Sequence, residues 1–324
     1  MTFNSIKTLQ NVVAIAAVTT MTAATNPAMA GTPIRVGISQ PAYSFVPLDV
    51  AMKSGVCKKY DLDIEKIVFS GSAQLHQAIS ANSVDIGLGA GPELGFLAKG
   101  APEMAIAAFA DAPEDLALVV LKDGPIKSID DLKSKRVSMS TRGSLTEWAA
   151  RMLSLKQGWG NEGMTMVPLG SFSAQTAALK TKQIDGMVVE AGTAGLLEEE
   201  GSGTTLVRFG NIVPNFHIHM AFATKVILEK QPDTVKKFMS CWTDGLAYMA
   251  THKAESVKIG SDTLNISANL SGKLYDLLMP HYNMTGKFDA KAVDVIAQSM
   301  VDMGTFPTKP DLTKYYTEEF LPKK

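Results

Sequence analysis

Short apolar runs alternate with helix-forming segments along the chain, and this alternation limits the folds that the sequence can adopt. Strand-like runs occupy residues 34–39, 63–70, 84–89, 104–110 and 116–121. Pro47 and Gly55 frame one helical segment between these runs, and Pro92 and Gly100 frame another, because proline fits the first turn of a helix and glycine its end. Strands that alternate with helices of this length predict a mostly parallel sheet with helices on both faces.

Residues 137–157 contain the clearest local motif, a short strand followed by a tight turn and an amphipathic helix. Ser144 and Glu147 fit the capping box S-x-x-E, so the helix should begin at Ser144. Free backbone N–H groups and the helix dipole favour an anion beyond the end of such a strand. Arg142 lies in the turn, where it either holds an acidic group or is a solvated turn residue. We predict that Arg142 and the helix start bind an acidic group of a ligand.

The middle of the chain predicts a second region of the same kind. Strand-like runs continue at residues 164–169, 186–190 and 205–209, and residues 217–224 predict a strand that returns to the first region. Residues 78–85 align without a gap with residues 178–185. Duplication would explain this alignment, and so would the general similarity of strand–helix–strand units. In either case the sequence predicts two α/β lobes of similar plan, followed by a helical segment that starts at Pro232.

The first thirty residues are typical of an export signal. Lys7 gives a weak positive start, residues 12–24 are mostly apolar, and Ala28-Met29-Ala30 matches the A-x-A cleavage pattern. The apolar run is too short for a transmembrane helix, although an uncleaved membrane anchor is the alternative. No cysteine follows the cleavage pattern directly, so a lipoprotein anchor is not indicated. We therefore expect a signal peptide that is cleaved after Ala30 and a protein located in the periplasm.

Charge and motifs exclude several classes of function. Without the leader, which contains Lys7, 30 basic residues stand against 32 acidic ones, a net charge of −2. A nucleic-acid-binding domain would be strongly basic. The chain has no G-x-S-x-G, H-E-x-x-H or P-loop motif. We therefore predict that the protein is not an enzyme and needs no cofactor.

Two pairs of residues could carry special chemistry. Cys57 and Cys241 could pair in an oxidising compartment, but their distance in the sequence gives no evidence of proximity, and we expect two buried free thiols. His217 and His219 have a spacing that can hold a metal ion. No third ligand is evident, so we interpret them as walls of a cleft and predict no metal site.

The segments at residues 34–55, 84–100, 128–144, 168–190 and 303–323 together resemble a known family. In order and spacing the chain is similar to the nitrate/sulfonate/taurine group of periplasmic solute-binding proteins of ABC transporters, within a broader set similar to the thiamine-precursor binding proteins. The resemblance implies a two-lobed periplasmic binding protein fold of type II, in which each lobe is a mostly parallel sheet flanked by helices. Two crossing segments would form the hinge, near residues 116–122 and 216–224. Lobe 1 would then contain residues 31–120 and 221–324, and lobe 2 residues 121–220.

The same resemblance implies a function. The protein would capture a small anionic organic solute, such as a sulfonate, taurine, nitrate or a carboxylate, and deliver it as a monomer to a membrane permease with its ATPase. A pyrimidine or thiamine-precursor binding protein is the alternative, as is a periplasmic enzyme or sensory partner on the same fold. The chain departs from sulfonate-binding relatives at residues 141–144 and at Glu190-Ala191. Cys57 and Cys241 do not resemble the cysteine-rich motif of related pyrimidine synthases.

Candidate ligand-binding residues follow from the rule that ligands bind beyond the carboxyl ends of strands in open α/β sheets. Tyr43 and Phe172 could sandwich a flat ligand or simply pack in the cleft wall. Glu190 could accept an amine of the ligand, but we favour an internal pair with Arg142. The full set that we predict is Ser39, Gln40, Tyr43, Gly71, Ser72, Gly89, Ala90, Glu93, Asp111, Thr141, Arg142, Gly143, Ser144, Phe172, Glu190 and His217. Asp111 could equally be a turn residue.

Overall fold

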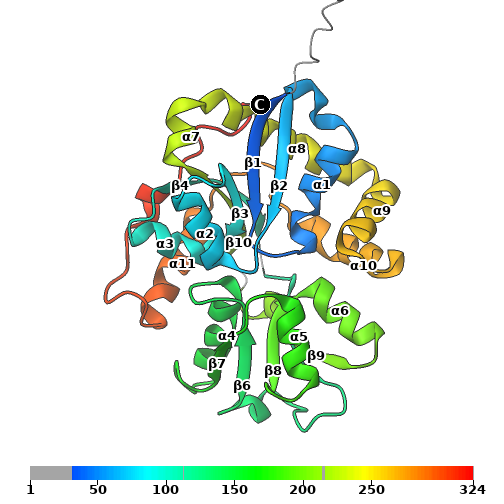
Figure 1. The fold of residues 1–324 in the computed structure, drawn as a ribbon. Coiled ribbons are helices and arrows are strands. Elements are labelled where there is room, and N and C mark those ends of the chain that lie inside the picture. Colours follow the sequence, from blue (N-terminus) through cyan, green and yellow to red (C-terminus); the bar gives the residue numbers. More distant parts are fainter. Residues whose placement is uncertain (1–30, 112, 214–215, 324) are drawn as a thin grey trace, which may run out of the picture. The chain divides into compact units, whose positions relative to one another are not determined.

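Two five-stranded sheets organise the computed structural model, which describes residues 31–111, 113–213 and 216–323 (Figure 1). The strand order is β2-β1-β3-β10-β4 in the first sheet and β7-β6-β8-β5-β9 in the second. We refer to each sheet with its covering helices as a lobe. The predicted signal peptide and its cleavage site lie outside the described residues. No helix in the described part of the chain is both long and apolar enough to cross a membrane.

Both sheets are mostly parallel, as predicted. The first contains β1 (Thr32–Ile38), β2 (Leu62–Val68), β3 (Ile86–Ala90), β4 (Glu103–Asp111) and β10 (His217–Thr224). The second contains β5 (Leu116–Leu121), β6 (Arg136–Met139), β7 (Thr165–Pro168), β8 (Gly186–Glu190) and β9 (Gly203–Arg208). One strand in each sheet, β10 and β5, runs antiparallel to both of its neighbours.

The structure moves the predicted lobe boundaries by a few residues. β5 pairs with β8 and β9, so it lies wholly in the second sheet, whereas we had assigned its first residues to lobe 1. β10 pairs with β4 from its first residue, His217, and with β3 from His219, so it belongs wholly to the first sheet. The apolar runs identify both segments as strands, but only their hydrogen-bond partners show to which sheet each strand belongs. The chain therefore crosses between β4 and β5 and returns between β9 and β10.

Helices cover the sheets in two groups (Figure 1). The first lobe has α1 (Val46–Lys53), α2 (Ser72–Ser80), α3 (Leu94–Ala98), α7 (Lys225–Lys230), α8 (Pro232–Thr251), α9 (Lys253–Leu264), α10 (Ala268–Leu278) and α11 (Ala290–Asp302). The second lobe has α4 (Leu145–Lys156), α5 (Phe172–Lys180) and α6 (Ala191–Glu199). α8 begins at the predicted Pro232 and buries Val235, Phe238 and Trp242 along one face.

The central strands are buried on both faces, which explains their continuous apolar sequence. In β5, Leu116, Leu118 and Val120 belong to the main core, which also includes the interior of the first lobe. Ala117 and Val119 belong to a separate core under α5 and α6. Successive side chains of a strand point to opposite faces, so β5 joins two cores.

The predicted similarity of the two lobes is confirmed by equivalent ion pairs. Arg35 at β1 binds Asp85 before β3, with 2.7 Å between Nη2 and Oδ1. Arg136 at β6 binds Asp185 before β8, with 3.0 Å between the same atoms. In both lobes the backbone N–H of the arginine also donates to Oδ2 of the aspartate at 2.9 Å. The aligned segments therefore occupy equivalent places in two sheets of the same plan.

The expectation of two free thiols is wrong, because Cys57 and Cys241 form a disulfide with 5.0 Å between their Cα atoms. Cys57 lies on the short 3-10 helix η2 (Val56–Tyr60), and Cys241 lies on α8. η2 packs against α8, and this packing brings together residues that are 184 positions apart. The bridge thus ties the two separate pieces of the first lobe to each other.

Candidate functional site

A small cavity lies where the carboxyl ends of strands from both sheets meet, and we call it the interlobe cavity. Its volume is about 20 Å³, which is room for about one water molecule. The first lobe contributes Ser39, Gln40, Ser72, Ala90, Glu93 and His219, and the second contributes Ser140, Leu145, Thr146, Phe172 and Glu190. Seven of the predicted ligand-binding residues line it, namely Ser39, Gln40, Ser72, Ala90, Glu93, Phe172 and Glu190.

The two lobes touch beside this cavity. The Gln40 side-chain amide donates to the carbonyl oxygens of Ser70 and Gly170, both at 3.3 Å, so it bridges the lobes. Thr141 Oγ1 accepts from the backbone N–H of Ala73 at 3.3 Å. Gly71 allows this approach, since a Cβ at that position would lie 2.7 Å from Cγ2 of Thr141. Gln40 Oε1 is buried and has no hydrogen-bond partner among the described residues, so it is available to a ligand.

The predicted helix start at Ser144 is confirmed. Ser144 is the N-cap of α4, and its Oγ accepts from the N–H of Glu147 at 3.3 Å. Glu147 Oε2 accepts from the N–H of Gly143 at 2.7 Å. The turn favours an acidic group, and a carboxylate of α4 itself already supplies one. Thr146 Oγ1 accepts from the N–H of Ser140 at 2.9 Å and fixes the strand–turn–helix connection against the cavity.

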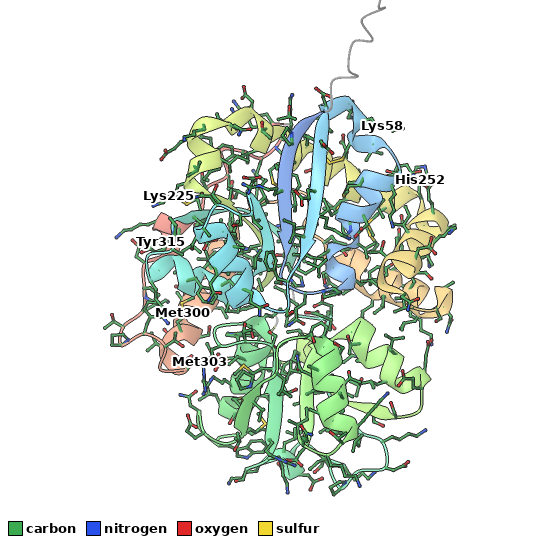
Figure 2. The ribbon with its side chains drawn as sticks, viewed as in Figure 1. Lys58, Lys225, His252, Met300, Met303 and Tyr315 are labelled. Atoms are coloured by element: carbon green, nitrogen blue, oxygen red, sulfur yellow. A yellow bond between two sulfur atoms is a disulfide. The ribbon has the colours of Figure 1, made fainter. Side chains whose placement is uncertain are left out.

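Arg142 does not line the interlobe cavity. Its side chain is 71% exposed, and Nη1 lies 3.7 Å from Glu147 Oε1, so the predicted pair between Arg142 and Glu190 is wrong. With Gly143 and Ser144 it borders a second, more open hollow of about 390 Å³, which we call the lateral groove. The groove is also lined by Phe96, Trp148, Met300 and Met303, and the two methionines lie at the end of α11 (Figure 2). The predicted role of Arg142 in ligand binding would place the ligand in the lateral groove, and we favour the interlobe cavity instead.

Three hydrogen-bond acceptors converge on one side of the interlobe cavity. Asp115, Glu190 and His219 are all buried, and one side-chain N or O atom of each lies within 4.8 Å of the other two. His219 Nε2 lies 3.2 Å from Asp115 Oδ2, and Ser44 Oγ donates a hydrogen bond to that oxygen. Burial, followed by the neighbouring charge of Asp115, raises the pKa of Glu190 well above its usual range. We call these three residues the acceptor cluster.

A second buried network holds Glu93. Ser72 Oγ donates to Glu93 Oε1 at 2.5 Å, and His76 Nε2 lies 2.6 Å from Glu93 Oε2. His76 Nδ1 lies 2.7 Å from Glu103 Oε1. Burial opposes a charge on His76, but hydrogen bonds and charge from the two carboxylates outweigh it and raise the pKa to about 9. Both Glu93 oxygens are therefore bonded, and Glu93 orients the hydroxyl of Ser72 at the cavity wall.

Tyr43 lies away from the cavity, so the predicted sandwich with Phe172 is not formed. The Tyr43 ring is buried, and its Oη lies 3.3 Å from Ser271 Oγ on α10. Burial raises the pKa of Tyr43 to about 12. Gly89 does not line the cavity either. Its lack of a side chain makes room for Glu93, because a Cβ there would collide with the Glu93 carboxylate.

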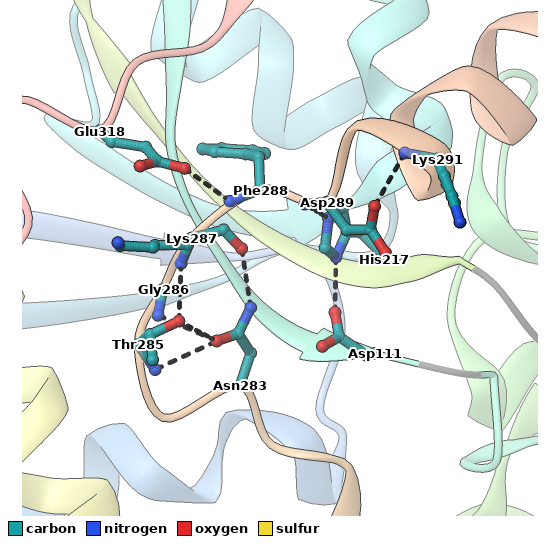
Figure 3. Close-up of polar contacts among 10 residues, drawn as sticks. All are labelled: Asp111, His217, Asn283, Thr285, Gly286, Lys287, Phe288, Asp289, Lys291 and Glu318. Atoms are coloured by element: carbon teal, nitrogen blue, oxygen red, sulfur yellow. Dashed lines mark hydrogen bonds and ion pairs between the residues drawn. The ribbon is translucent and has the colours of Figure 1, made fainter.

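His217 and Asp111 bind each other rather than a ligand (Figure 3). The backbone N–H of Asp289 donates to His217 Nε2 at 2.7 Å, so the proton of the neutral ring is on Nδ1 and is donated to Asp111 Oδ1. Both ring nitrogens are therefore occupied. His217 and His219 have different partners, and the metal-binding pair that their spacing allowed is not formed.

Sequence reasoning left several cavity residues out of the predicted set. The sequence predicts His219 only as part of the cleft wall, which is where it lies, and Ser140 is the last residue before the predicted turn. Leu145 and Thr146 were not considered, because they belong to the first turn of α4 and the strand-end rule stops at the turn before it. The small polar residue two places after an N-cap is the signal that could have identified Thr146.

Comparisons with known proteins agree with this architecture. Residues 43–256 match the family model described as NMT1/THI5 like. A Haemophilus influenzae protein named "Putative thiamine biosynthesis protein" is 25% identical over 280 residues, which cover 83% of this chain and 86% of that protein. No statement about the ligand of this chain follows from that name.

Two solved structures share the fold at low sequence identity. The alkanesulfonate-binding protein SsuA from Xanthomonas axonopodis pv. citri, bound to MOPS, has a TM-score of 0.77 and 17% identity, and the match covers 88% of this chain and 98% of SsuA. The periplasmic nitrate-binding protein NrtA from Synechocystis PCC 6803 has a TM-score of 0.71 and 13% identity, with 90% and 87% covered. The predicted periplasmic binding protein fold is confirmed, and the chain belongs to the NMT1/THI5-like family.

Proposed function

We propose that this protein is the solute-binding component of an ABC importer. It captures a small organic solute in the interlobe cavity and delivers it to a membrane permease with its ATPase. The observation that carries this proposal is the cavity itself, because polar side chains from two similar sheets converge there at the strand ends. The Gln40 contact between the lobes supports closure around the solute by hinge bending.

The proposed location is the periplasm, after cleavage of a signal peptide behind Ala30, and the proposed state is a monomer. The disulfide between Cys57 and Cys241 supports this location, since such bridges persist in oxidising compartments. The name of NrtA, a periplasmic nitrate-binding protein with the same fold, supports this location as well.

A binding role fits the cavity better than catalysis does. A serine nucleophile needs a neighbouring base, most often a histidine. Among the described cavity residues, Ser72 donates to Glu93 and no serine hydroxyl is bonded to a histidine nitrogen. We therefore propose that the protein is not an enzyme and holds its solute by hydrogen bonds and apolar contact with Phe172.

For the solute we propose a small molecule with an acidic group, such as a sulfonate, taurine, nitrate or a carboxylate. The first residues of α2, α4 and α5 line the cavity, and helix starts favour anions. A thiamine-precursor-like pyrimidine is the second candidate. The buried, unpaired Oε1 of Gln40 favours it, because that oxygen can accept a hydrogen bond from an amino group of the solute.

Thermal unfolding of the purified protein with a panel of solutes tests this function. We expect one class among alkanesulfonates, taurine, nitrate, carboxylates and aminopyrimidines to raise the unfolding temperature, because binding to the folded state at 100 times Kd adds about 2.7 kcal/mol. The same solute should reduce the radius of gyration in small-angle scattering. If no class stabilises the protein, or if saturation leaves the radius unchanged, the proposed capture by closure is contradicted.

A further inference from the structure

We propose that Asp115, Glu190 and His219 form a binding site for a divalent transition-metal ion beside the interlobe cavity. One ligand atom from each residue lies within 4.8 Å of the other two. The exposed fractions of these residues are 2%, 7% and 2%, so the atoms are shielded from bulk water. The proposal goes beyond the capture of an organic solute and does not rest on it.

His219 is held as a metal-binding histidine is held. Its Nδ1 donates to the carbonyl oxygen of Gly89 at 3.1 Å, which fixes the ring orientation and leaves a lone pair on Nε2 of the neutral ring, 3.2 Å from Asp115 Oδ2. The rings of Phe45 and Phe109 lie 4.9 and 5.8 Å from the imidazole, measured between centroids. Nε2 therefore has a defined direction, toward Asp115.

The two carboxylates supply acceptors that lack donors. Asp115 Oδ1 and Glu190 Oε2 are buried and have no hydrogen-bond partner among the described residues. Burying such atoms without a partner costs free energy, and two adjacent carboxylates repel each other unless a proton or a cation lies between them. A divalent cation held by one oxygen of each carboxylate and by His219 Nε2 would offset this cost.

The size of the cavity and the kind of ligand atoms indicate the class of ion. The space of about 20 Å³ between the lobes admits an ion or a water molecule as it stands, whereas an organic solute enters only when the lobes open. One imidazole nitrogen with two carboxylate oxygens suits Zn²⁺ and similar first-row ions, whereas Mg²⁺ and Ca²⁺ prefer oxygen ligands alone. Three protein ligands leave a fourth position for water or an oxygen of the solute.

The three ligands come from both lobes, so the ion would also hold them together. His219 lies on β10 of the first sheet, and Glu190 ends β8 of the second. Asp115 directly precedes β5, and its carbonyl oxygen accepts from the N–H of Ala191 at 2.5 Å. Binding of the ion should therefore favour the closed arrangement of the lobes.

Calorimetric titration of the chelator-stripped protein with ZnCl₂ alone tests this site. We expect one ion per chain, and no competition from excess MgCl₂. His219→Gln and Glu190→Gln should each weaken binding by at least about 100-fold, beyond the 10–100-fold loss typical of outer-shell residues. His252→Gln is the matched control, because His252 is exposed at the end of α8 (Figure 2), and it should bind within about twofold of the parent.

Absence of saturable binding in the parent would overturn the proposal. A proton shared by the Asp115 and Glu190 carboxyl groups would then explain why the two lie together in the acceptor cluster. Equal binding in the parent and in both cluster variants would also overturn the proposal, as would loss in His252→Gln. Unfolding temperatures of the stripped variants show which of them are folded, and a single folded cluster variant suffices for the comparison. Solute binding that persists in chelator, with no binding of Zn²⁺, would overturn the metal site and leave the proposed transport function intact.

Discussion

Replacing His76 with alanine should lower the free energy of unfolding by about 3–5 kcal/mol, the usual cost of breaking a buried ion pair. His76 is 3% exposed, and each of its ring nitrogens faces a carboxylate, Glu93 on one side and Glu103 on the other. Without the imidazole, both acids would stay buried with no cation between them. Chemical denaturation of the parent and the variant at neutral pH measures the difference.

The pH dependence gives an independent test of this network. The pKa of His76 is raised from 6.5 to about 9 in the folded protein. A group with a raised pKa stabilises the folded state fully below its unfolded pKa, and the contribution is lost as pH rises through the folded pKa. The stability difference between parent and His76→Ala should therefore be largest below about pH 6.5 and shrink toward about pH 9.

His252→Ala is the control for this comparison, because His252 is exposed, stacks on Tyr248 and has polar side-chain contacts only with its chain neighbours Thr251 and Tyr248 among the described residues. Its stability should stay within about 0.5 kcal/mol of the parent, as for most surface substitutions. If His76→Ala unfolds at the same denaturant concentration as the parent, or if the difference does not change with pH, the charged network is not the source of the stability.

Replacing both Cys57 and Cys241 with serine should destabilise the protein by about 2–5 kcal/mol. The bridge joins residues that are 184 positions apart, so its loss releases a large loop in the unfolded chain. It also removes the covalent link between the two pieces of the first lobe, on η2 and α8. Denaturation of the oxidised parent and the double variant gives the difference.

Reduction of the parent is the matched control, because it breaks the same bond without a substitution. The reduced parent and the double variant should unfold at similar denaturant concentrations. If the double variant is as stable as the oxidised parent, the bridge contributes nothing to stability in solution.

The fold could be predicted where the information is local. The capping box at Ser144 and the proline at the start of α8 place two helices correctly, because the deciding contacts lie within one turn. The pairing of Cys57 with Cys241 could not be predicted, since it depends on the packing of η2 against α8. The sheet to which β5 belongs depends in the same way on its partners, and not on its own apolar sequence.

The candidate site shows the same limit. The strand-end rule finds Gln40, Ser72 and Glu190, because chain topology alone brings strand ends to one edge of a sheet. It also selects Arg142, which lies outside the interlobe cavity and faces Glu147 of the next helix, because the rule does not show that Glu147 supplies an acid for this turn. His219 and Asp115 converge on Glu190 only through the crossing of the chain between the lobes, which no local pattern contains.

The most direct test of the central claim asks which of the two hollows binds the solute. Calorimetric titration with a solute that stabilises the parent should compare Gln40→Ala, in the interlobe cavity, with Arg142→Ala, at the lateral groove. We predict that Gln40→Ala weakens binding by about 1–3 kcal/mol, the cost of an unmade buried hydrogen bond. Arg142→Ala should bind like the parent, because its guanidinium is largely in water. Loss of binding in Arg142→Ala with full binding in Gln40→Ala would contradict the account and place the solute in the lateral groove.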